Sequence, residues 1–204
     1  MMENNHQDLK NIGAVILAAG RSSRMGQPKM TLPWGNTTVI GKVVSSFLKT
    51  GIIDIVVVTG GAHQQTEQAL NNFPVKMIYN PVFAEKEMLV SLQMGIKHLD
   101  KTTRAFFIAL GDHPQIDSKI IHQMIDIYLT EQVTIIVPSY QMKRGHPWLV
   151  CYEMGLDLLA VDETSSLRDF LNQNHQLIRY LNVNSPGVLK DLDTPEEYQQ
   201  EKPQ

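Results

Sequence analysis

Cysteine is nearly absent from this sequence: Cys151 is the only one in 204 residues. A single cysteine excludes an intramolecular disulfide and any metal site built from several thiolates. Its neighbours Val150 and Tyr152 are apolar or aromatic, so we expect a small buried residue there.

Long apolar runs and excess charge of one sign are also lacking. The segment Met1 to Lys10 is polar, unlike a signal peptide, and no run approaches the roughly 20 residues of a membrane span. We therefore expect a cytoplasmic protein with no membrane partner. The formal net charge of −3 and the pI near 6.1 disfavour a nucleic-acid partner, although a local cationic pocket is compatible with them.

Two common phosphate-binding loops are missing, G-x-x-x-x-G-K-[ST] and G-x-G-x-x-G, which disfavours a P-loop ATPase and a dinucleotide-binding dehydrogenase. Residues 16–29 instead read Ile-Leu-Ala-Ala-Gly-Arg-Ser-Ser-Arg-Met-Gly-Gln-Pro-Lys. Gly20 and Gly26 allow sharp turns and exposed N–H groups, while Arg21, Arg24 and Lys29 offer positive charge to a polyphosphate. This composition predicts a phosphate-binding loop that follows an apolar strand.

Short apolar segments alternate with helical patterns, which is typical of βαβ units on a mainly parallel sheet. The patterns predict strands at 14–17, 53–58, 77–79, 105–110 and 133–137 and helices at 36–48, 63–70, 88–99 and 118–129. Asn36 or Thr37 is expected to cap the helix 36–48, and Gly51 to close it. We predict an α/β fold: a three-layer, Rossmann-like, mainly parallel sheet with helices on both faces, in a single domain over 1–204.

The regularity loosens after Ser139. We expect a strand at 149–152, short helices at 154–160 and 166–172, and a further strand at 177–183. Thr194 and Glu197 fit a capping box with Pro195 in the first helical position, so Asp191 and Asp193 stand on the turn before a helix.

Asp112 directly follows the apolar strand 105–110, and ligands of open α/β sheets bind at the carboxyl ends of strands. Mg2+ is typically held by one or two carboxylates together with substrate phosphates. Asp112 can supply one carboxylate, and either Asp191 or Asp193 the other.

These segments together resemble the MobA-like nucleotidyltransferases. The family's first strand ends in Leu-Ala-[Ala/Gly]-Gly-x-[Ser/Gly]-x-Arg-Met-Gly and continues to a lysine. The matching residues here are Leu17, Ala18, Ala19, Gly20, Ser22, Arg24, Met25, Gly26 and Lys29. The family's Gly-Asp-x-Pro corresponds to Gly111 to Pro114, and its late Asp-x-Asp-Thr-Pro-Glu to Asp191 to Glu196.

Two weaker matches support the resemblance. Arg144-Gly145-His146-Pro147 contains the Gly-His-Pro with which cytidylyltransferases of this family meet their pterin substrate. Asn80-Pro81, Met88 and Ser91-Leu92 match a second stretch, in which Glu87 stands where the family usually has glycine.

The resemblance implies a nucleotide-diphospho-sugar transferase type of fold, with a nucleotide-binding half near 12–115 and an acceptor-binding half near 116–199. It implies catalytic roles for Arg24, Lys29 and Asp112, and a Mg2+ held by Asp112 with Asp193 or Asp191. The implied nucleotide-binding residues are Leu17, Ala18, Ala19, Gly20, Arg21, Ser22, Arg24, Met25, Gly26, Lys29, Asn80, Ser91, Gly111 and Asp112; those for the acceptor are Arg144, Gly145, His146 and Pro147.

The implied reaction joins CTP to the terminal phosphate of molybdenum-loaded molybdopterin, giving the cytosine dinucleotide cofactor and pyrophosphate, with a xanthine dehydrogenase type hydroxylase as recipient. In this family an Ala at position 19 accompanies CTP and a Gly accompanies GTP, so Ala19 favours CTP. The alternatives are a guanylyltransferase on the same cofactor, a sugar or polyol phosphate cytidylyltransferase, and a non-catalytic cofactor carrier.

Overall fold

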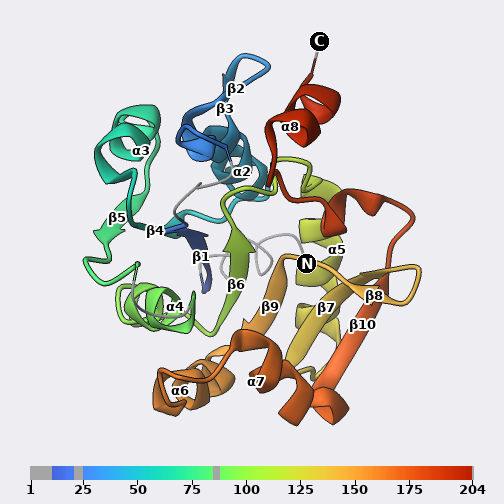
Figure 1. The fold of residues 1–204 in the computed structure, drawn as a ribbon. Helices are drawn as coiled ribbons and strands as arrows, with labels where there is room; N and C mark the ends of the chain where they lie inside the picture. The colour runs from blue at the N-terminus through green and yellow to red at the C-terminus, as the bar shows by residue number, and fades with distance from the viewer. Residues whose placement is uncertain (1–10, 21–24, 85–87, 204) are drawn as a thin grey trace.

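One sheet runs through the whole molecule. The computed structural model describes residues 11–20, 25–84 and 88–203. Its main strands are β1 (Ile12–Ala18), β4 (Asp54–Thr59), β5 (Lys76–Tyr79), β6 (Ala105–Leu110), β7 (Ile135–Tyr140), β9 (Trp148–Cys151) and β10 (Ile178–Asn182). They lie in the order β10-β7-β9-β6-β1-β4-β5, and the short strand β8 (Lys143–Arg144) pairs with β7 (Figure 1).

Most neighbouring strands are parallel; the exceptions are the short β8, which pairs antiparallel with β7, and β9. Strand β9 runs antiparallel to both β6 and β7, between which it lies. The start of β9 therefore reaches the same edge of the sheet as the carboxyl ends of β6 and β7. This arrangement brings the segment just before β9 to the edge where ligands of parallel sheets bind.

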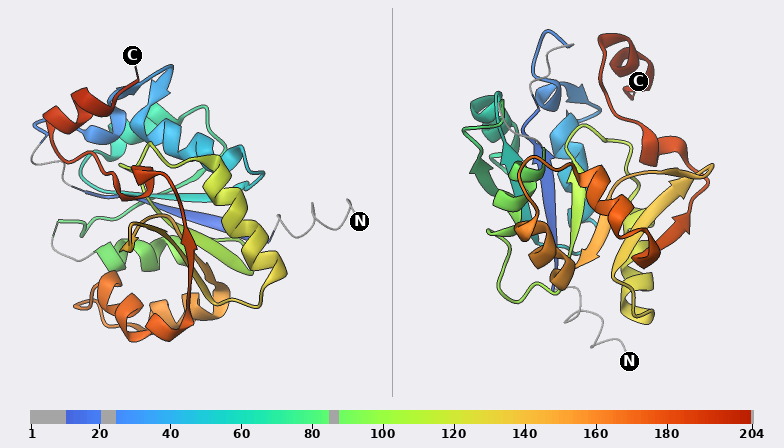
Figure 2. Two further views of the ribbon diagram at one scale, coloured as in Figure 1. Left: turned by 90° about the vertical axis from the view of Figure 1, so that its right-hand side faces the viewer. Right: turned by 60° about the horizontal axis from the view of Figure 1, so that its bottom comes forward.

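Helices cover both faces of the sheet. One face packs on α2 (Val39–Leu48), α3 (His63–Leu70) and α5 (Ser118–Thr130), and the other on α4 (Met88–Ile96), α6 (Tyr152–Ala160) and α7 (Leu167–Gln173) (Figure 2). Successive residues of β1 alternate between these two clusters, Ile16 in one and Leu17 in the other. Because both faces are covered, β1 and β6 at the centre of the sheet have no polar side chain along their whole length.

A third, smaller apolar cluster lies beside the sheet. It joins the hairpin of β2 (Pro33–Trp34) and β3 (Thr37–Thr38) to the last helix, α8 (Pro195–Glu201). Trp34, Leu192 and Tyr198 are buried there, and the Tyr198 hydroxyl donates to the carbonyl of Pro33 at 2.7 Å. This cluster fastens α8, late in the sequence, to the early β2–β3 hairpin. No helix among the described residues is long and apolar enough to cross a membrane.

Several predicted boundaries were wrong. Helix α2 begins at Val39 rather than Asn36, because Thr37 and Thr38 pair with β2, and its cap is the Thr38 side chain. The predicted close at Gly51 is confirmed: Gly51 has φ 86° and its N–H donates to Leu48 at 3.0 Å. Strand β7 covers 135–140 rather than 133–137, and α6 begins at 152 rather than 154.

The remaining short elements were not predicted. They are the strands β2, β3 and β8 and the 3-10 helices η1 (Lys29–Thr31), η2 (His175–Leu177) and η3 (Pro186–Leu189). The Asp117 side chain caps α5. The capping box predicted for the last helix is confirmed: α8 has the Thr194–Glu197 pair with Pro195 in its first turn.

Candidate active site

The carboxyl ends of β1 and β6 lie side by side and form the base of the site. Leu17 is in register with Leu110, and the N–H of Gly111 donates to the Leu17 carbonyl at 2.9 Å. A cavity of about 350 Å³ opens at this edge. It is lined by Leu17, Ala19, Gly20, Lys29, Met30, Phe83, Met88, Ser91, Leu110, Asp112, Asp191 and Asp193.

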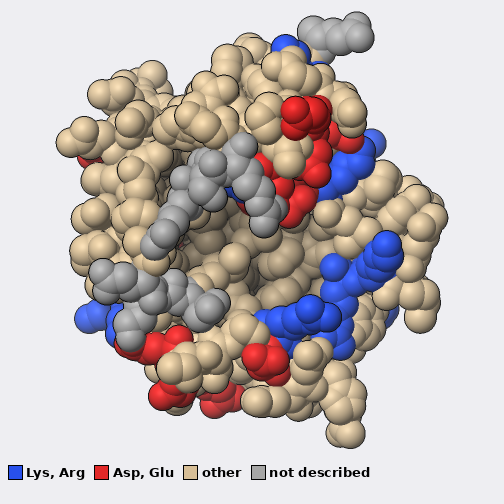
Figure 3. All heavy atoms as spheres, in the orientation of Figure 1, with Lys and Arg blue, Asp and Glu red and all other residues tan. Residues whose placement is uncertain are grey.

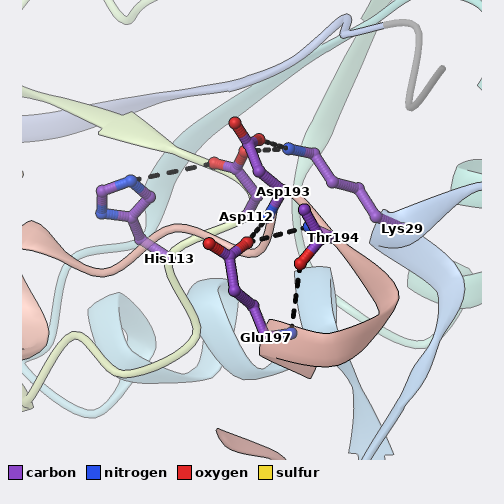
Figure 4. A network of polar contacts seen from close by, with 6 residues as sticks. All are labelled: Lys29, Asp112, His113, Asp193, Thr194 and Glu197. Atoms are coloured by element: carbon purple, nitrogen blue, oxygen red, sulfur yellow. Dashed lines mark hydrogen bonds and ion pairs between the residues drawn. The ribbon is translucent and has the colours of Figure 1, made fainter. Parts of the chain in front are cut away.

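Lys29 is the centre of a charged cluster in this cavity (Figure 4). It stands at the start of η1, is 7% exposed, and its ammonium binds the carboxylate of Asp112 and, at 3.1 Å, Oδ1 of Asp193. Burial disfavours its charged form, but the two carboxylates outweigh burial and raise the pKa of Lys29 above its usual value. Lys29 is therefore a fixed positive charge at neutral pH.

Asp193 is held in place by the start of α8. The Glu197 carboxylate accepts the backbone N–H groups of Asp193 and Thr194, each at 2.9 Å, while the Thr194 hydroxyl accepts the N–H of Glu197 at 3.2 Å (Figure 4). These bonds close the capping box and orient the residue just before it. Asp191 also lines the cavity, but its side chain is exposed.

The donor set suits a magnesium ion. Because Asp112 and Asp193 bind the same ammonium, their carboxylates converge on one point that a cation can occupy. In the part of the chain that the structure describes, no three or more His, Cys, Asp or Glu side chains form a complete metal cage. A pair of carboxylates that leaves other positions to phosphates and water is the arrangement typical of Mg2+.

An aromatic residue that was not predicted from the sequence, Phe83, lines the same cavity. Its ring packs against Gly60 so closely that a Cβ on Gly60 would lie 2.6 Å from the ring. Only glycine permits this approach, so Gly60 helps to position Phe83. Asn80 is buried nearby and donates to the Ser91 hydroxyl at 2.9 Å.

A second cavity of about 670 Å³ adjoins the first, with Met88 and Leu110 lining both. The other residues that line it are Leu89, Met142, Lys143, Arg144, His146, Trp148, Ser166, Leu167, Arg168, Leu171 and Asn172. Of the predicted acceptor residues, Arg144 and His146 are among them. Lys143 and Arg168 were missed, because an isolated basic residue carries no motif.

Charge is divided between the two cavities. The first is lined by Lys29 and three aspartates, whereas the described lining of the second has three basic side chains, Lys143, Arg144 and Arg168, and no carboxylate. Figure 3 shows acidic side chains above the central hollow and basic ones below it. Arg144 is oriented by Tyr180, whose hydroxyl accepts from Nε at 2.8 Å, and by Asn172, which accepts from Nη1 at 2.7 Å.

Three rings pack together at the second cavity, which His146 and Trp148 line. His146 stacks on Trp148 with centroids 4.5 Å apart and meets His113 edge-on at 5.7 Å. Within the described residues, the Nδ1 atoms of both histidines are enclosed and lack a hydrogen-bond partner. Burial, with His113 close by, lowers the pKa of His146 to about 3, and burial also lowers the pKa of His113. Both rings are neutral at neutral pH.

The remaining predicted residues are placed as follows. Ala18 and Gly111 are buried beside the cavity, Met25 belongs to the third apolar cluster, and Gly26 has φ 64°. Gly145 and Pro147 are buried on either side of His146, with Pro147 in the cis form. Arg21, Ser22 and Arg24 lie outside the described residues, as does Glu87.

Comparison with models of known protein families shows which family this chain belongs to. The family model described as the MobA-like NTP transferase domain matches residues 14–177, most of the chain. The chain belongs to this family. It is a nucleotidyltransferase, and the family predicted from the sequence is confirmed.

The relatives cover nearly the whole chain. It is 28% identical to the molybdenum cofactor cytidylyltransferase of Escherichia coli K12, over 92% of this chain and 93% of that protein. It is 26% identical to a probable molybdenum cofactor guanylyltransferase of Bacillus cytotoxicus, over 93% and 96% respectively. The two relatives are about equally similar to this chain, yet one is named for cytidylyl transfer and the other for guanylyl transfer.

The solved structure of Rv0371c from Mycobacterium tuberculosis H37Rv is similar throughout, with a TM-score of 0.81, 25% identity, and 94% of this chain and 97% of that one covered. A second structure of Rv0371c, a complex with manganese, has a TM-score of 0.77 at 24% identity over the same shares. The predicted three-layer α/β fold of the nucleotide-diphospho-sugar transferase type is confirmed.

Proposed function

We propose that this protein transfers CMP from CTP to the terminal phosphate of molybdenum-loaded molybdopterin, releasing pyrophosphate. The observation that carries the proposal is the pair of adjoining cavities, of which one holds the Lys29, Asp112 and Asp193 cluster and the other is basic. A transfer between two substrates needs two sites that meet where the new bond forms. The name of the E. coli relative supports this choice of substrates.

The proposed reaction needs no catalytic base. An oxygen of the acceptor phosphate, already ionised at neutral pH, bonds to the α-phosphorus of CTP as the bond to pyrophosphate breaks. The protein must therefore position the two phosphates and neutralise charge. We assign charge stabilisation to Lys29 and, from the sequence motif, to Arg24. We assign binding of the departing pyrophosphate to the amides of residues 20–26.

Asp112 and Asp193 are the residues we expect to hold Mg2+, since both carboxylates face one point; Asp191 is the exposed alternative. When bound, the ion would neutralise charge on the nucleotide phosphates. Lys29 lies between the same carboxylates, so its ammonium would have to shift from this position if a cation were held by both. The manganese complex of Rv0371c is consistent with a divalent ion in this family.

Ala19 and Phe83 bear on the choice of base. Both residues line the nucleotide cavity, where the Cβ of Ala19 leaves less space than a glycine would, and a smaller space disfavours a purine. We therefore favour CTP. The guanylyltransferase function remains the second candidate, because the B. cytotoxicus relative is named for it and its similarity is close to that of the cytidylyltransferase.

The two predicted halves correspond to the two cavities in this proposal. Residues 12–115 supply most of the nucleotide cavity, and 116–199 supply most of the basic cavity together with Asp191 and Asp193 of the first. A sugar or polyol phosphate cytidylyltransferase would not require molybdopterin, and a carrier would bind the product without turnover. The recipient of the finished cofactor would be a molybdenum hydroxylase.

The deciding experiment is pyrophosphate release by the purified protein with Mg2+ and molybdenum-loaded molybdopterin, with CTP and GTP compared in parallel. We expect turnover with CTP. Turnover with GTP alone would identify a guanylyltransferase, turnover of CTP with a sugar or polyol phosphate in place of molybdopterin would identify that class, and product binding without turnover would identify a carrier.

Asp112→Asn and Lys29→Met test the cluster itself. Asp112→Asn should abolish Mg2+-dependent turnover while the protein stays folded, because Lys29 keeps its contact with Asp193. Lys29→Met should lower kcat by about 10²- to 10³-fold, the usual cost of losing one charge-stabilising donor. Lys190→Met, which removes a lysine paired with Glu201 outside both cavities, is the matched control. Full turnover by a folded Asp112→Asn variant would contradict the assignment.

A further inference from the structure

The β7–β8 hairpin has an unfavourable turn. Its two central residues, Gln141 and Met142, have φ angles of 49° and 65°. Both lie in the left-handed region, which two-residue hairpins commonly fill with Asn-Gly because other side chains are strained there. A turn of two such residues costs folding free energy, and strain of this kind concentrates at functional sites.

Met142 is also the most exposed large apolar side chain among those described, at 94%. This exposed position is relevant to binding, because Met142 lines the mouth of the 670 Å³ basic cavity. Folding therefore gains little from this side chain, which neither packs in a core nor suits its turn. A ligand in the cavity would be the first partner to remove it from water.

The rest of the hairpin is fixed, so its tip has a defined place at the cavity. Arg144 is in register with Ser139 and is anchored to Tyr180 and Asn172. The N–H of Gly145 donates to the Pro138 carbonyl at 2.8 Å. Trp148, whose ring is stacked on His146, lines the same cavity.

We propose that Met142 is a specificity residue that covers a flat heterocyclic ring of the acceptor at the mouth of the basic cavity. The proposal rests on the proposed function and deepens it. A thioether is polarisable and makes favourable contacts with ring systems. Trp148 is a second apolar residue that lines this cavity, and the basic side chains can meet the anionic groups of such an acceptor. A sugar phosphate has no flat ring for this contact.

Two variants distinguish the effect of the Met142 thioether from the effect of the strained turn. Asparagine adopts the left-handed conformation readily, so both Gln141→Asn and Met142→Asn relieve the turn, but only the second removes the thioether. Each variant should raise the melting temperature by about 2–4 °C. Met142→Asn should also raise the KM for molybdenum-loaded molybdopterin, and its Kd in equilibrium dialysis without nucleotide, about tenfold. The KM for CTP and kcat should stay the same.

The control for loss of an exposed apolar side chain is Ile53→Ala, 64% exposed and placed just before the amino end of β4. An unchanged Kd in Met142→Asn would overturn the proposal, as would an equal rise in Gln141→Asn. Binding of molybdopterin by the wild type without CTP turnover would instead contradict the proposed function, and the dialysis comparison would still test Met142. No binding by the wild type would contradict both.

Discussion

At the scale of single residues, the nucleotide cavity depends on one ammonium between two carboxylates. Lys29 reaches Asp112, 83 positions later in the sequence, and Asp193, 164 positions later. The positive charge of Lys29 partly balances the negative charges of the two aspartates in the absence of a ligand. This pairing offsets part of the free-energy cost of burying the charged groups. The three elements that carry these residues, η1, the end of β6 and the start of α8, are therefore linked by charge as well as by packing.

The neutral ring of His146 makes folding sensitive to acid. In the unfolded chain a histidine has a pKa near 6.5, whereas burial lowers the pKa of His146 to about 3 in the native protein. Between these values the unfolded state binds a proton that the native state does not, so stability falls as pH falls from 6.5. Solvent in the cavity reaches one edge of His146 and reduces this effect slightly. We therefore expect the free energy of unfolding to fall by about 2 kcal/mol between pH 7 and 4.5.

Urea unfolding at pH 7 and 4.5 measures this loss. His146→Gln should be less stable than the wild type at pH 7 but should show a smaller decrease on acidification. His122→Gln, which changes an exposed histidine on α5, should keep the wild-type decrease. An identical decrease in all three proteins would assign the acid sensitivity to other groups.

At the scale of elements, periodicity predicted the structure wherever an element is long enough to show a pattern. The helices α2, α3, α4 and α5 and the central strands were predicted within a few residues. The failures are local pairings: Thr37 and Thr38 read as the start of a helix because only their pairing with β2 makes them a strand. The turn at Gln141 and Met142 could not be predicted from the sequence, because neither residue type favours turns.

Helix α4 depends on a glycine where propensity alone would favour alanine. A Cβ on Gly95 would lie 2.3 Å from Cγ1 of Val15 and 3.0 Å from Cγ2 of Val58. Gly95→Ala gains about 1 kcal/mol of helix propensity, but overpacking costs about 1–3 kcal/mol, so we expect net destabilisation in urea unfolding. The substitution Val15→Ala removes the methyl group that a Cβ on Gly95 would meet at 2.3 Å. In that background Gly95→Ala should no longer destabilise, and a loss that persists would point to another cause.

The start of α8 should affect metal binding through Asp193. Glu197→Ala removes the acceptor for the N–H groups of Asp193 and Thr194, which orient the carboxylate. Loss of such an outer partner typically weakens metal binding at least tenfold, so we expect the Kd for Mn2+, followed by EPR, to rise about tenfold. Glu196→Ala, an exposed neighbour on the same helix, should leave the Kd unchanged. Equal effects of both variants would mean that helix charge, rather than orientation, is responsible.

At the scale of the whole molecule, the sequence predicted the site in part. Motifs pointed to Asp112 and the late aspartates, which line one cavity, because the spacing of such residues is recognisable. Four residues of the predicted glycine loop, 21–24, lie outside the described residues. Motifs did not show that Lys29 joins Asp112 to Asp193, that Phe83 packs on Gly60, or that Lys143 and Arg168 meet in one cavity. These are contacts between single residues distant in sequence, which only the folded chain brings together.

The division of charge between the cavities predicts separable effects on the two substrates. Arg168→Gln removes one basic side chain from the larger cavity, and a lost charge-assisted hydrogen bond should raise the acceptor KM about ten- to hundredfold with the KM for CTP unchanged. Steady-state kinetics with each substrate varied in turn measures both. Arg179→Gln, which breaks a surface pair with Glu131 at 2.9 Å, is the control. A parallel rise in the KM for CTP would contradict the separation.

The antiparallel strand β9 also governs the order in which the chain can assemble. Its two neighbours, β6 and β7, precede it in the sequence, so both have left the ribosome before the strand that joins them. Until residue 151 emerges, β6 has an open edge and β7 has no place in the sheet. We expect a nascent chain that pauses there to be prone to aggregation, and a gene split at the boundary of the two halves to yield no independently folding fragment.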